Sequence, residues 1–254
     1  MRLDTLVHYL DDYLRVAEAV ADAPEAMNGL QVANAGEVNR LAVAVDLCEA
    51  TVRMAVEQRA DLLLVHHGLF WGGLRPLVGP AYRRVAGLIT GNVALYAAHL
   101  PLDRHPEVGN NSVLARLLGI QIRGEFGSYH GAPLGVWGEP GERSGTRDDL
   151  SRALTKVLGS APRILPFGPD RVQRIGIVTG AGGSMIPQAA AAGLDTYVTG
   201  EGQHWTYFDA EELGLNVFYA GHYATETVGV KALAEHLSQK FDLTWVFLDH
   251  PTGL

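Results

Sequence analysis

Cysteine is almost absent from this chain, and long apolar runs are missing altogether. One cysteine, Cys48, stands among 254 residues, which excludes a disulfide framework within the chain and any cysteine-rich zinc site. Cys48 is interpreted as a small buried side chain rather than a reactive thiol. No apolar run reaches the roughly 18 residues that a membrane-spanning helix needs, and acidic residues interrupt the N-terminal segment where a signal peptide would be apolar. We therefore expect a soluble, cytoplasmic protein.

Positive charge is also in short supply. The chain has 20 Lys and Arg against 28 Asp and Glu, a formal net charge of −8. Nucleic-acid surfaces need clustered cations that release counterions, so nucleic acid is not an expected partner. A small anionic substrate stays compatible with this balance, because two bound divalent ions would add about four positive charges to one cleft. The length suits one large α/β domain or two lobes of about 125 residues each.

Two adjacent histidines, His66 and His67, follow the apolar residues 62–65. The apolar run predicts a buried strand, and the carboxyl end of such a strand is where ligands collect in an open α/β sheet. Neighbouring residues on an extended chain point to opposite sides, so each imidazole is expected to bind its own ion of a close pair. The alternative is one hydrogen-bonded core histidine beside one loop histidine.

Residues 40–68 and 174–202 share one hydrophobic pattern at a constant offset of 134, and His67 corresponds to Glu201. In the first copy, residues 40–46 and 62–65 predict strands and residues 49–59 predict a helix. This is a βαβ unit, whose two strands should be parallel with a right-handed crossover. The second copy predicts the same unit again.

A second repeat follows each βαβ unit. Residues 93–103 and 216–226 are apolar strands that end in His-x-x-x-carboxylate, first as His99 and Asp103, then as His222 and Glu226. We therefore predict an α/β fold of two similar lobes, residues 1–125 and 126–254, related by a pseudo-twofold axis, with mixed, mostly parallel sheets flanked by helices. The strand ends of both lobes should face a shared cleft, and the C-terminal segment could pack back on the first lobe.

The remaining elements follow from local patterns. Apolar spacing predicts further helices at residues 3–20, 111–118, 147–158 and 228–237. Further strands are expected after the turn at residues 28–29, within residues 125–136, and at residues 163–167 and 242–249. Glycine and proline between residues 127 and 145 mark turns.

Imidazoles and carboxylates gather where these apolar strands end. Such groups are costly near a core unless something binds them, and a divalent ion would do so. Nitrogen and oxygen donors without thiolates suit Zn, Fe, Mn, Co or Ni and disfavour Ca. Two ions about 3.5 Å apart, bridged by a carboxylate, would activate water between them, which predicts a dinuclear metallohydrolase. The residues are His66, His67, His99, Asp103, Glu201, His204, His222 and Glu226.

Several of these residues have a second interpretation. His99 could orient a ligand by a hydrogen bond instead of binding metal. His204 could be an exposed loop residue or a substrate contact, and Glu201 could be an ordinary carboxylate at a helix start. Four other histidines have no supporting pattern and are assigned to surface or structure: His105, His130, His236 and His250.

The glycine-rich residues 180–185 follow a strand and precede a helix. A backbone cradle for phosphate could form there, although a plain tight turn is the simpler interpretation, because the spacing matches no nucleotide-binding fingerprint. The sequence has no Gly-x-Ser-x-Gly nucleophile motif, which leaves metal-activated water as the supported nucleophile.

Five motifs in this order resemble the Nif-three-like dinuclear metal-centre proteins, whose members carry the name type 2 GTP cyclohydrolase I homologues. They are NGLQV (28–32), LLLVHHGLFW (62–71), HLPLDRHPEVGNN (99–111), VTGAGG (178–183) and GHYATE (221–226). The resemblance implies a toroidal homohexamer with two divalent ions per subunit. Carried over by position, it implies His67, Asp103 and Glu226 on one ion and His66, His222 and Glu226 on the other, with Glu226 bridging.

The resemblance also implies an activity, the opening of the GTP guanine ring to give formate and dihydroneopterin triphosphate. A neighbouring His or Glu would shuttle protons, and the candidate catalytic residues are Glu226, His99 and Glu201. GTP is then the candidate anionic substrate. The alternative function is a metal-binding hexameric scaffold or regulator that binds partner proteins or metabolites without turnover.

Overall fold

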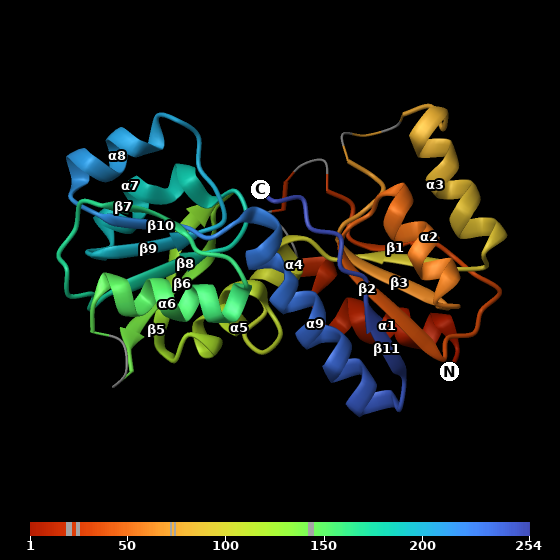
Figure 1. The fold of residues 1–254 in the computed structure, drawn as a ribbon. Helices are drawn as coiled ribbons and strands as arrows, with labels where there is room; N and C mark the ends of the chain where they lie inside the picture. The colour runs from red at the N-terminus through yellow and green to blue at the C-terminus, as the bar shows by residue number, and fades with distance from the viewer. Residues whose placement is uncertain (19–21, 24–25, 72, 74, 142–144) are drawn as a thin grey trace. The chain divides into compact units, whose positions relative to one another are not determined.

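A computed structural model describes residues 1–18, 22–23, 26–71, 73, 75–141 and 145–254. The chain forms two compact units, and Figure 1 shows one sheet with flanking helices in each. Unit 1 consists of Met1–Gly109 and Gly229–His250, and unit 2 of Asn110–Val228 and Pro251–Leu254. The fold is therefore a mixed α/β fold with two sheets. The division expected from the sequence lies after residue 125.

The sheet of unit 1 has the strand order β1-β4-β3-β2-β11. Its strands are β1 (Gly29–Val32), β4 (Ala94–Ala97), β3 (Leu62–His67), β2 (Arg40–Asp46) and β11 (Thr244–Phe247). Only the β1–β4 pair is antiparallel among the described strands of this sheet. The βαβ unit of β2, α2 (Glu49–Glu57) and β3 confirms the prediction. β3 is longer than expected and includes both histidines, so Asp46 lies opposite His67 in the ladder.

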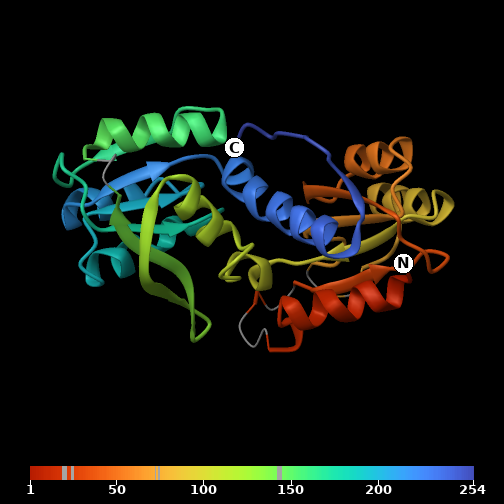
Figure 2. The same cartoon turned by 90° about the horizontal axis from the view of Figure 1, so that it is seen from below.

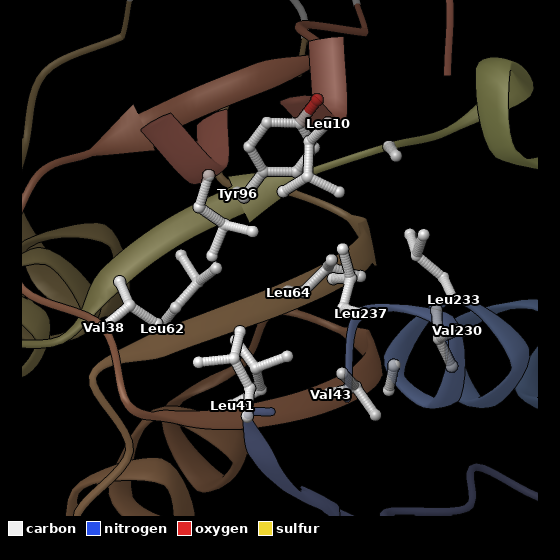
Figure 3. Close-up of a cluster of buried hydrophobic side chains, with 14 of the residues drawn as sticks. Leu10, Val38, Leu41, Val43, Leu62, Leu64, Tyr96, Val230, Leu233 and Leu237 are labelled. Carbon is white, nitrogen blue, oxygen red and sulfur yellow. The ribbon is translucent and has the colours of Figure 1, made fainter. Parts of the chain in front are cut away.

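Helices cover both faces of this sheet, because successive side chains of a strand point to opposite sides. Leu62 and Leu64 pack with α1 (Leu3–Tyr13) and with the part of α9 (His222–Phe241) that belongs to unit 1. Figure 3 shows Leu64 in this cluster with Leu10, Tyr96 and Leu237. Leu63 and Val65 pack on the other face with Val52 of α2 and Leu88 of α3 (Gly79–Thr90). Burial on both faces explains the uninterrupted apolar run before the histidines.

The N-terminal helix is shorter than the sequence predicted. α1 ends at Tyr13 and a short 3₁₀ turn, η1 (Val16–Glu18), follows. Positions 19 and 20, where the predicted helix ended, lie outside the described residues.

The sheet of unit 2 has the strand order β5-β6-β8-β9-β10-β7. Its strands are β5 (Ile120–Tyr129), β6 (Ala132–Pro140), β8 (Ile175–Val178), β9 (Thr196–Thr199), β10 (Asn216–Tyr219) and β7 (Arg163–Pro166). β8, β9 and β10 run parallel, whereas β5–β6, β6–β8 and β10–β7 are antiparallel. The expectation of a mostly parallel sheet is therefore right for unit 1 and wrong for unit 2.

The long hairpin β5–β6 is the main reason for this difference (Figure 2). His130 and Gly131 connect its strands, and both have positive φ, 50° and 86°. Two successive positive φ angles are the signature of a two-residue type I′ turn, which matches the twist of antiparallel strands. The sequence showed turn residues here, but a single strand was expected.

Helices also flank the second sheet. α7 (Ile186–Ala191) and α8 (Thr206–Leu213) contribute Ile186 and Ala210 to a core with Tyr197 and Val217. α6 (Arg147–Leu158) lies across the sheet from them in Figure 1 and has its predicted bounds. α6 begins with a capping box between Thr146 and Asp149, and α5 (Asn110–Leu117) precedes the hairpin. None of the described helices combines the length and apolar character that a bilayer crossing requires.

The sequence repeat corresponds to repeated structure. At the offset of 134, β8 and β9 fall on residues 41–44 and 62–65, inside β2 and β3, and α7 falls inside α2. In both units a third parallel strand, β4 or β10, follows next to the second. The carboxyl ends of these strands carry the candidate ligands of each unit.

His105, one of the histidines assigned to surface or structure, fixes the segment after α4 (Leu100–Asp103) to α1. Its Nε2 donates to the Tyr13 carbonyl oxygen at 3.0 Å. Its Nδ1 accepts from the amides of Glu107 and Val108, each at 3.2 Å. Only a neutral ring can donate at one nitrogen and accept at the other. Burial accordingly lowers the pKa of His105 below its ordinary value.

We expect unfolding to become easier as the pH falls below about 6.5, the ordinary pKa of histidine. The unfolded chain takes up a proton near that pH, whereas folded His105, with its lowered pKa, resists protonation. The stability from the neutral ring is thus complete above about 6.5 and is lost as the pH falls toward the lowered pKa, by at most about 1.4 kcal/mol per pH unit. Urea unfolding at pH 5 to 7.5 should show a steeper pH slope for the unaltered protein than for His105→Gln. Equal slopes would contradict this assignment.

Candidate metal centre

His66 is fully buried near the end of β3. Its Nδ1 lies 2.8 Å from the carbonyl oxygen of Ala98. Because a carbonyl oxygen can only accept, the proton sits on Nδ1 and the lone pair on Nε2. Nε2 lies 3.5 Å from Oδ2 of Asp103, the last residue of α4, which is itself 5% exposed. The predicted ligands His66 and Asp103 are therefore neighbours.

His67 makes the corresponding bond to a carboxylate. Its Nδ1 lies 2.8 Å from Oδ1 of Asp46, which ends the neighbouring strand β2. A carboxylate acceptor also places the ring proton on Nδ1 and leaves Nε2 as the donor atom for a metal, an arrangement typical of histidine ligands. The motifs and repeats of the sequence do not indicate Asp46. Its position at the end of the strand before the histidine strand is the only signal that could have indicated it.

His99 precedes α4 and is held from two sides. Its Nδ1 lies 2.7 Å from Oδ1 of Asp22, and its backbone amide donates to Oδ1 of Asn28 at 2.7 Å. Burial opposes the charge of Asp22, but hydrogen bonds from His99, Asn28 and the Ala23 amide together keep the pKa of its carboxyl below the usual value. Asp22 was also missed from sequence. The motif residue Asn28 positions His99 as well as beginning a turn.

These three imidazoles form a compact cluster, which we call the three-histidine group. One ring nitrogen from each of His66, His67 and His99 lies within 4.8 Å of the others. The ring centroids of His66 and His67 are only 4.7 Å apart, so the two adjacent histidines do not diverge as an ideal strand would require. Trp71 covers the group, with its ring edge-on to His99 at 4.9 Å.

Glycine follows the histidine pair because no side chain fits there. A Cβ at Gly68 would lie 2.6 Å from the Cβ of Ala97 and from the amide of Gln31. Gln31 in turn accepts from the Leu69 amide at 2.7 Å, which fixes the chain directly after the histidines. The NGLQV motif thus supports the three-histidine group through Asn28 and Gln31.

In unit 2 the predicted residues Glu201, His222 and Glu226 lie together. His222 is the first residue of α9; its Nδ1 is 2.8 Å from Oε1 of Glu201, and its Nε2 is 3.2 Å from Oε2 of Glu226. The bond to Glu226, with that to Glu201, raises the pKa of His222 to about 9, although burial opposes this. Glu226 is 3% exposed. The repeat therefore yields a second imidazole and carboxylate pair.

The glycine-rich residues 180–185 have packing roles. The amides of Gly180 and Gly182 donate to the hydroxyls of Thr225 and Thr199, at 3.1 Å each, and the Gly183 amide donates to the Glu201 carbonyl oxygen. Amides engaged in this way support the tight-turn interpretation over a phosphate cradle. Gly180 has φ +68°, and a Cβ there would overlap Oε1 of Glu226.

Replacing Asp46 by asparagine should weaken metal binding without unfolding unit 1. The amide can present its NH₂ to Nδ1 and favour the wrong tautomer, so His67 would lose its orienting carboxylate. Loss of such a partner costs roughly tenfold to a hundredfold in metal affinity. Competition with a chromophoric chelator would measure this for Zn²⁺. Asp195→Asn in unit 2, a carboxylate that accepts backbone amides of Gln173 and Arg174, is the control and should bind Zn²⁺ as the unaltered protein does.

The donor set of each unit fits a divalent transition metal. All three imidazoles of the three-histidine group have Nδ1 committed to an oxygen acceptor, which is the tautomer that a metal ligand through Nε2 needs. Carboxylates lie beside the imidazoles in both units. Such imidazole and carboxylate sets suit Zn, Fe, Mn, Co or Ni. A metal could therefore bind at these histidines and carboxylates.

Comparison with known proteins agrees with the motifs. The family model Duf34/NIF3 (NGG1p interacting factor 3) matches residues 1–252. A Deinococcus radiodurans protein named GTP cyclohydrolase 1 type 2 homolog is 43% identical over 99% of this chain and 94% of its own length. A Halobacterium salinarum protein of the same name is 46% identical over 96% of each chain. The crystal structure of TTHA1606 from Thermus thermophilus covers 100% of both chains with 45% identity and a TM-score of 0.90. The chain therefore belongs to the Duf34/NIF3 family.

Proposed function

We propose that this protein is a dinuclear metal-dependent hydrolase acting on a nucleotide or a related phosphorylated heterocycle. The ligands would be His66, His67, Asp103, His222 and Glu226, as the family resemblance implies. The observation that carries the proposal is the three-histidine group, in which every Nδ1 is held by an oxygen acceptor. Histidines that bind a metal typically donate their other ring N–H to a carboxylate or a backbone carbonyl. Three neighbouring imidazoles oriented in this way therefore support a metal site.

Bound divalent ions would supply Lewis acidity and a water of lowered pKa, the usual contribution of a two-metal site to hydrolysis. The protein's own residues would orient the ligands and carry protons. Asp46 and Asp22 hold the rings of His67 and His99 in one tautomer. Glu201, whose side chain is 47% exposed, reaches both solvent and Nδ1 of His222. It is the candidate proton carrier, with His99 as a positioning residue.

The raised pKa of His222 bears on this role. Near neutral pH its ring holds protons at both nitrogens, donated to Glu201 and Glu226. Ligation through Nε2 would require that proton to leave, so metal uptake at His222 should release a proton.

GTP is the named candidate substrate, because the curated relatives carry the name GTP cyclohydrolase 1 type 2 homolog. The reaction would hydrolyse the imidazole ring of guanine and release formate. The test is to incubate GTP with protein loaded with Zn²⁺, Fe²⁺ or Mn²⁺, and to assay both formate and the fluorescent pterin. We expect product from the unaltered protein and none from His67→Ala. The control His8→Ala, which changes an exposed histidine on α1, should also give product. No product with any of the three metals would remove GTP as the substrate.

The oligomer is a further part of the proposal. We propose a homohexamer, as the resemblance implies, and α3 offers a surface for such contacts. Val78, the residue just before α3, and Tyr82 and Ile89 within it follow one another at spacings of four and seven residues, and they are 69%, 60% and 62% exposed. Exposed apolar residues on one helix face commonly mark a protein interface. Native mass spectrometry should show a hexamer for the unaltered chain and smaller species for Tyr82→Glu with Ile89→Glu.

The same surface favours the second candidate function, a metal-binding scaffold that acts through a partner protein without turnover. That candidate predicts a partner that still binds His67→Ala protein. It fails if a broad hydrolase screen finds a substrate whose turnover the His67→Ala change abolishes.

A further inference from the structure

A cavity of about 520 Å³ lies in unit 2. It forms where β9 and β10 end, between the loop after β9, the start of α8 and the first residue of β7, which is paired with the last residue of β10. The carboxyl ends of parallel strands are the usual ligand position in α/β sheets, and the volume lies in the range of small-molecule sites. Its lining includes Arg163, Gln203, His204, Tyr207, Phe208 and Tyr219.

Hydrogen bonds hold the wall of this cavity in place. The Thr206 hydroxyl donates to the Gln203 carbonyl oxygen at 2.5 Å. Its one proton is thereby used, so the Tyr219 hydroxyl, also 2.5 Å away, donates to Thr206. A Cβ at Gly202 would lie 2.6 Å from the Tyr219 oxygen and 2.7 Å from the Thr206 oxygen. The loop can therefore pack here only because residue 202 is glycine, and the cavity is built rather than incidental.

The lining combines flat apolar faces with one cation. Phe208 packs edge-on against Tyr207 at 5.5 Å and against His204 at 5.7 Å. Tyr219 contributes a third aromatic side chain. Arg163 makes no salt bridge within 4.0 Å to any carboxylate of the described residues. In a chain of net charge −8, a guanidinium without a carboxylate partner beside three aromatic rings is suited to a planar ring that carries negative charge.

The cavity is joined to the candidate metal ligands through the chain. Gly202 in its wall directly follows Glu201, whose carboxylate accepts from Nδ1 of His222. His204, for which the sequence left open a loop position or a substrate contact, lines the same cavity. A ligand held here would thus lie on the segment that carries the candidate proton carrier.

We propose that this cavity binds the planar heteroaromatic ring of a small anion, with the ring against Phe208 and Tyr207 and the negative group at Arg163. This inference rests on the proposed function only where binding is connected to turnover. The bound ring would then be the part of a nucleotide-like substrate that unit 2 recognises. Binding itself is independent of metal.

Isothermal titration with guanosine monophosphate, guanosine and inorganic phosphate tests the proposal on the full chain, both metal-loaded and chelated. Removing one stacking partner of a base costs about tenfold or more in affinity. Phe208→Ala should therefore lower the affinity for guanosine monophosphate and for guanosine by at least tenfold. Arg163→Gln should lower the affinity for guanosine monophosphate and leave the affinity for guanosine unchanged. Trp205→Ala, an exposed neighbour outside the lining, and Arg152→Gln are matched controls and should bind as the unaltered protein does.

The outcomes separate this inference from the proposed function. The cavity proposal is overturned if guanosine monophosphate binds Phe208→Ala and Arg163→Gln as tightly as it binds the unaltered chain. It is also overturned if guanosine monophosphate does not bind the unaltered chain at millimolar concentration. His67→Ala should leave the binding unchanged. The proposed function fails alone if the binding pattern holds but no substrate is turned over. The cavity proposal fails alone if turnover needs His67 but not Phe208 or Arg163.

Discussion

Replacing His67 by alanine is expected to lower metal affinity by roughly a hundredfold or more, beyond the loss caused by removing an outer partner. Asp46 holds Nδ1 of His67 and leaves Nε2 as the donor atom for a metal, so the variant would lack one of the three imidazole donors of the three-histidine group. Elemental analysis should find about two ions per unaltered chain and at least one fewer in the variant. Zn²⁺ should raise the melting temperature of the unaltered protein and leave that of the variant almost unchanged, because a bound ligand stabilises only the state that binds it.

The fold should survive this change. The His67 side chain is 19% exposed and Asp46 is 38% exposed, so its carboxylate can be hydrated when the imidazole is gone. With metal chelated, the free energy of unfolding should differ from that of the unaltered protein by about 1 kcal/mol or less. His8→Ala serves as the control, since His8 lies exposed on α1. Full metal content in His67→Ala would disprove the metal centre as described.

Replacing Gly180 by alanine is expected to damage both stability and the candidate ligands of unit 2. The residue has φ +68°, which costs an alanine about 1 kcal/mol. Its Cβ would overlap Oε1 of Glu226 and lie 3.4 Å from Nε2 of His222. Displacing a buried carboxylate adds an overpacking cost of about 1 to 3 kcal/mol. The total destabilisation should therefore exceed about 2 kcal/mol, measured by urea unfolding of chelated protein.

Gly193→Ala separates the two causes. Gly193 has nearly the same φ, +71°, but a Cβ there would meet nothing within 4 Å. Gly193→Ala should lower the free energy of unfolding only by the backbone cost of about 1 kcal/mol, and it should keep full metal content. Equal losses of stability in the two variants, or full metal content in Gly180→Ala, would show that Glu226 has room to move and that the close approach is unimportant.

Local sequence was enough to predict the parallel strands and the candidate ligands. Residues 41–45 and 62–65 are buried on both faces of the sheet and are therefore apolar without interruption. This pattern can be recognised without knowing which strand pairs with which. The repeat at offset 134 then located β8 and β9. Because His66 and His67 directly follow the apolar residues 62–65, and Glu201 stands at the position of His67 in the repeat, the motifs indicated these candidate residues from the sequence alone.

Helices α3 and α8 were not predicted, for reasons that are local as well. α3 contains Gly79, Pro80 and Gly87 and exposes Tyr82 and Ile89, so its composition and its apolar residues do not mark a helix packed on a core. α8 likewise exposes Phe208 and Leu213. The hairpin β5–β6 was underestimated because its length depends on pairing between strands, which local alternation does not specify.

By itself the sequence determined the βαβ order, the duplication and the histidines and carboxylates at the strand ends, because apolar periodicity and motif spacing are properties of neighbouring residues. The tertiary structure alone decided which carboxylates orient those histidines. Asp46 reaches His67 across a strand ladder, and Asp22 reaches His99 over 77 positions. The cavity beside Glu201 likewise exists only after β7 pairs with β10. Hydrogen bonds of this kind depend on distances that the folded backbone sets, and no pattern along the chain records them.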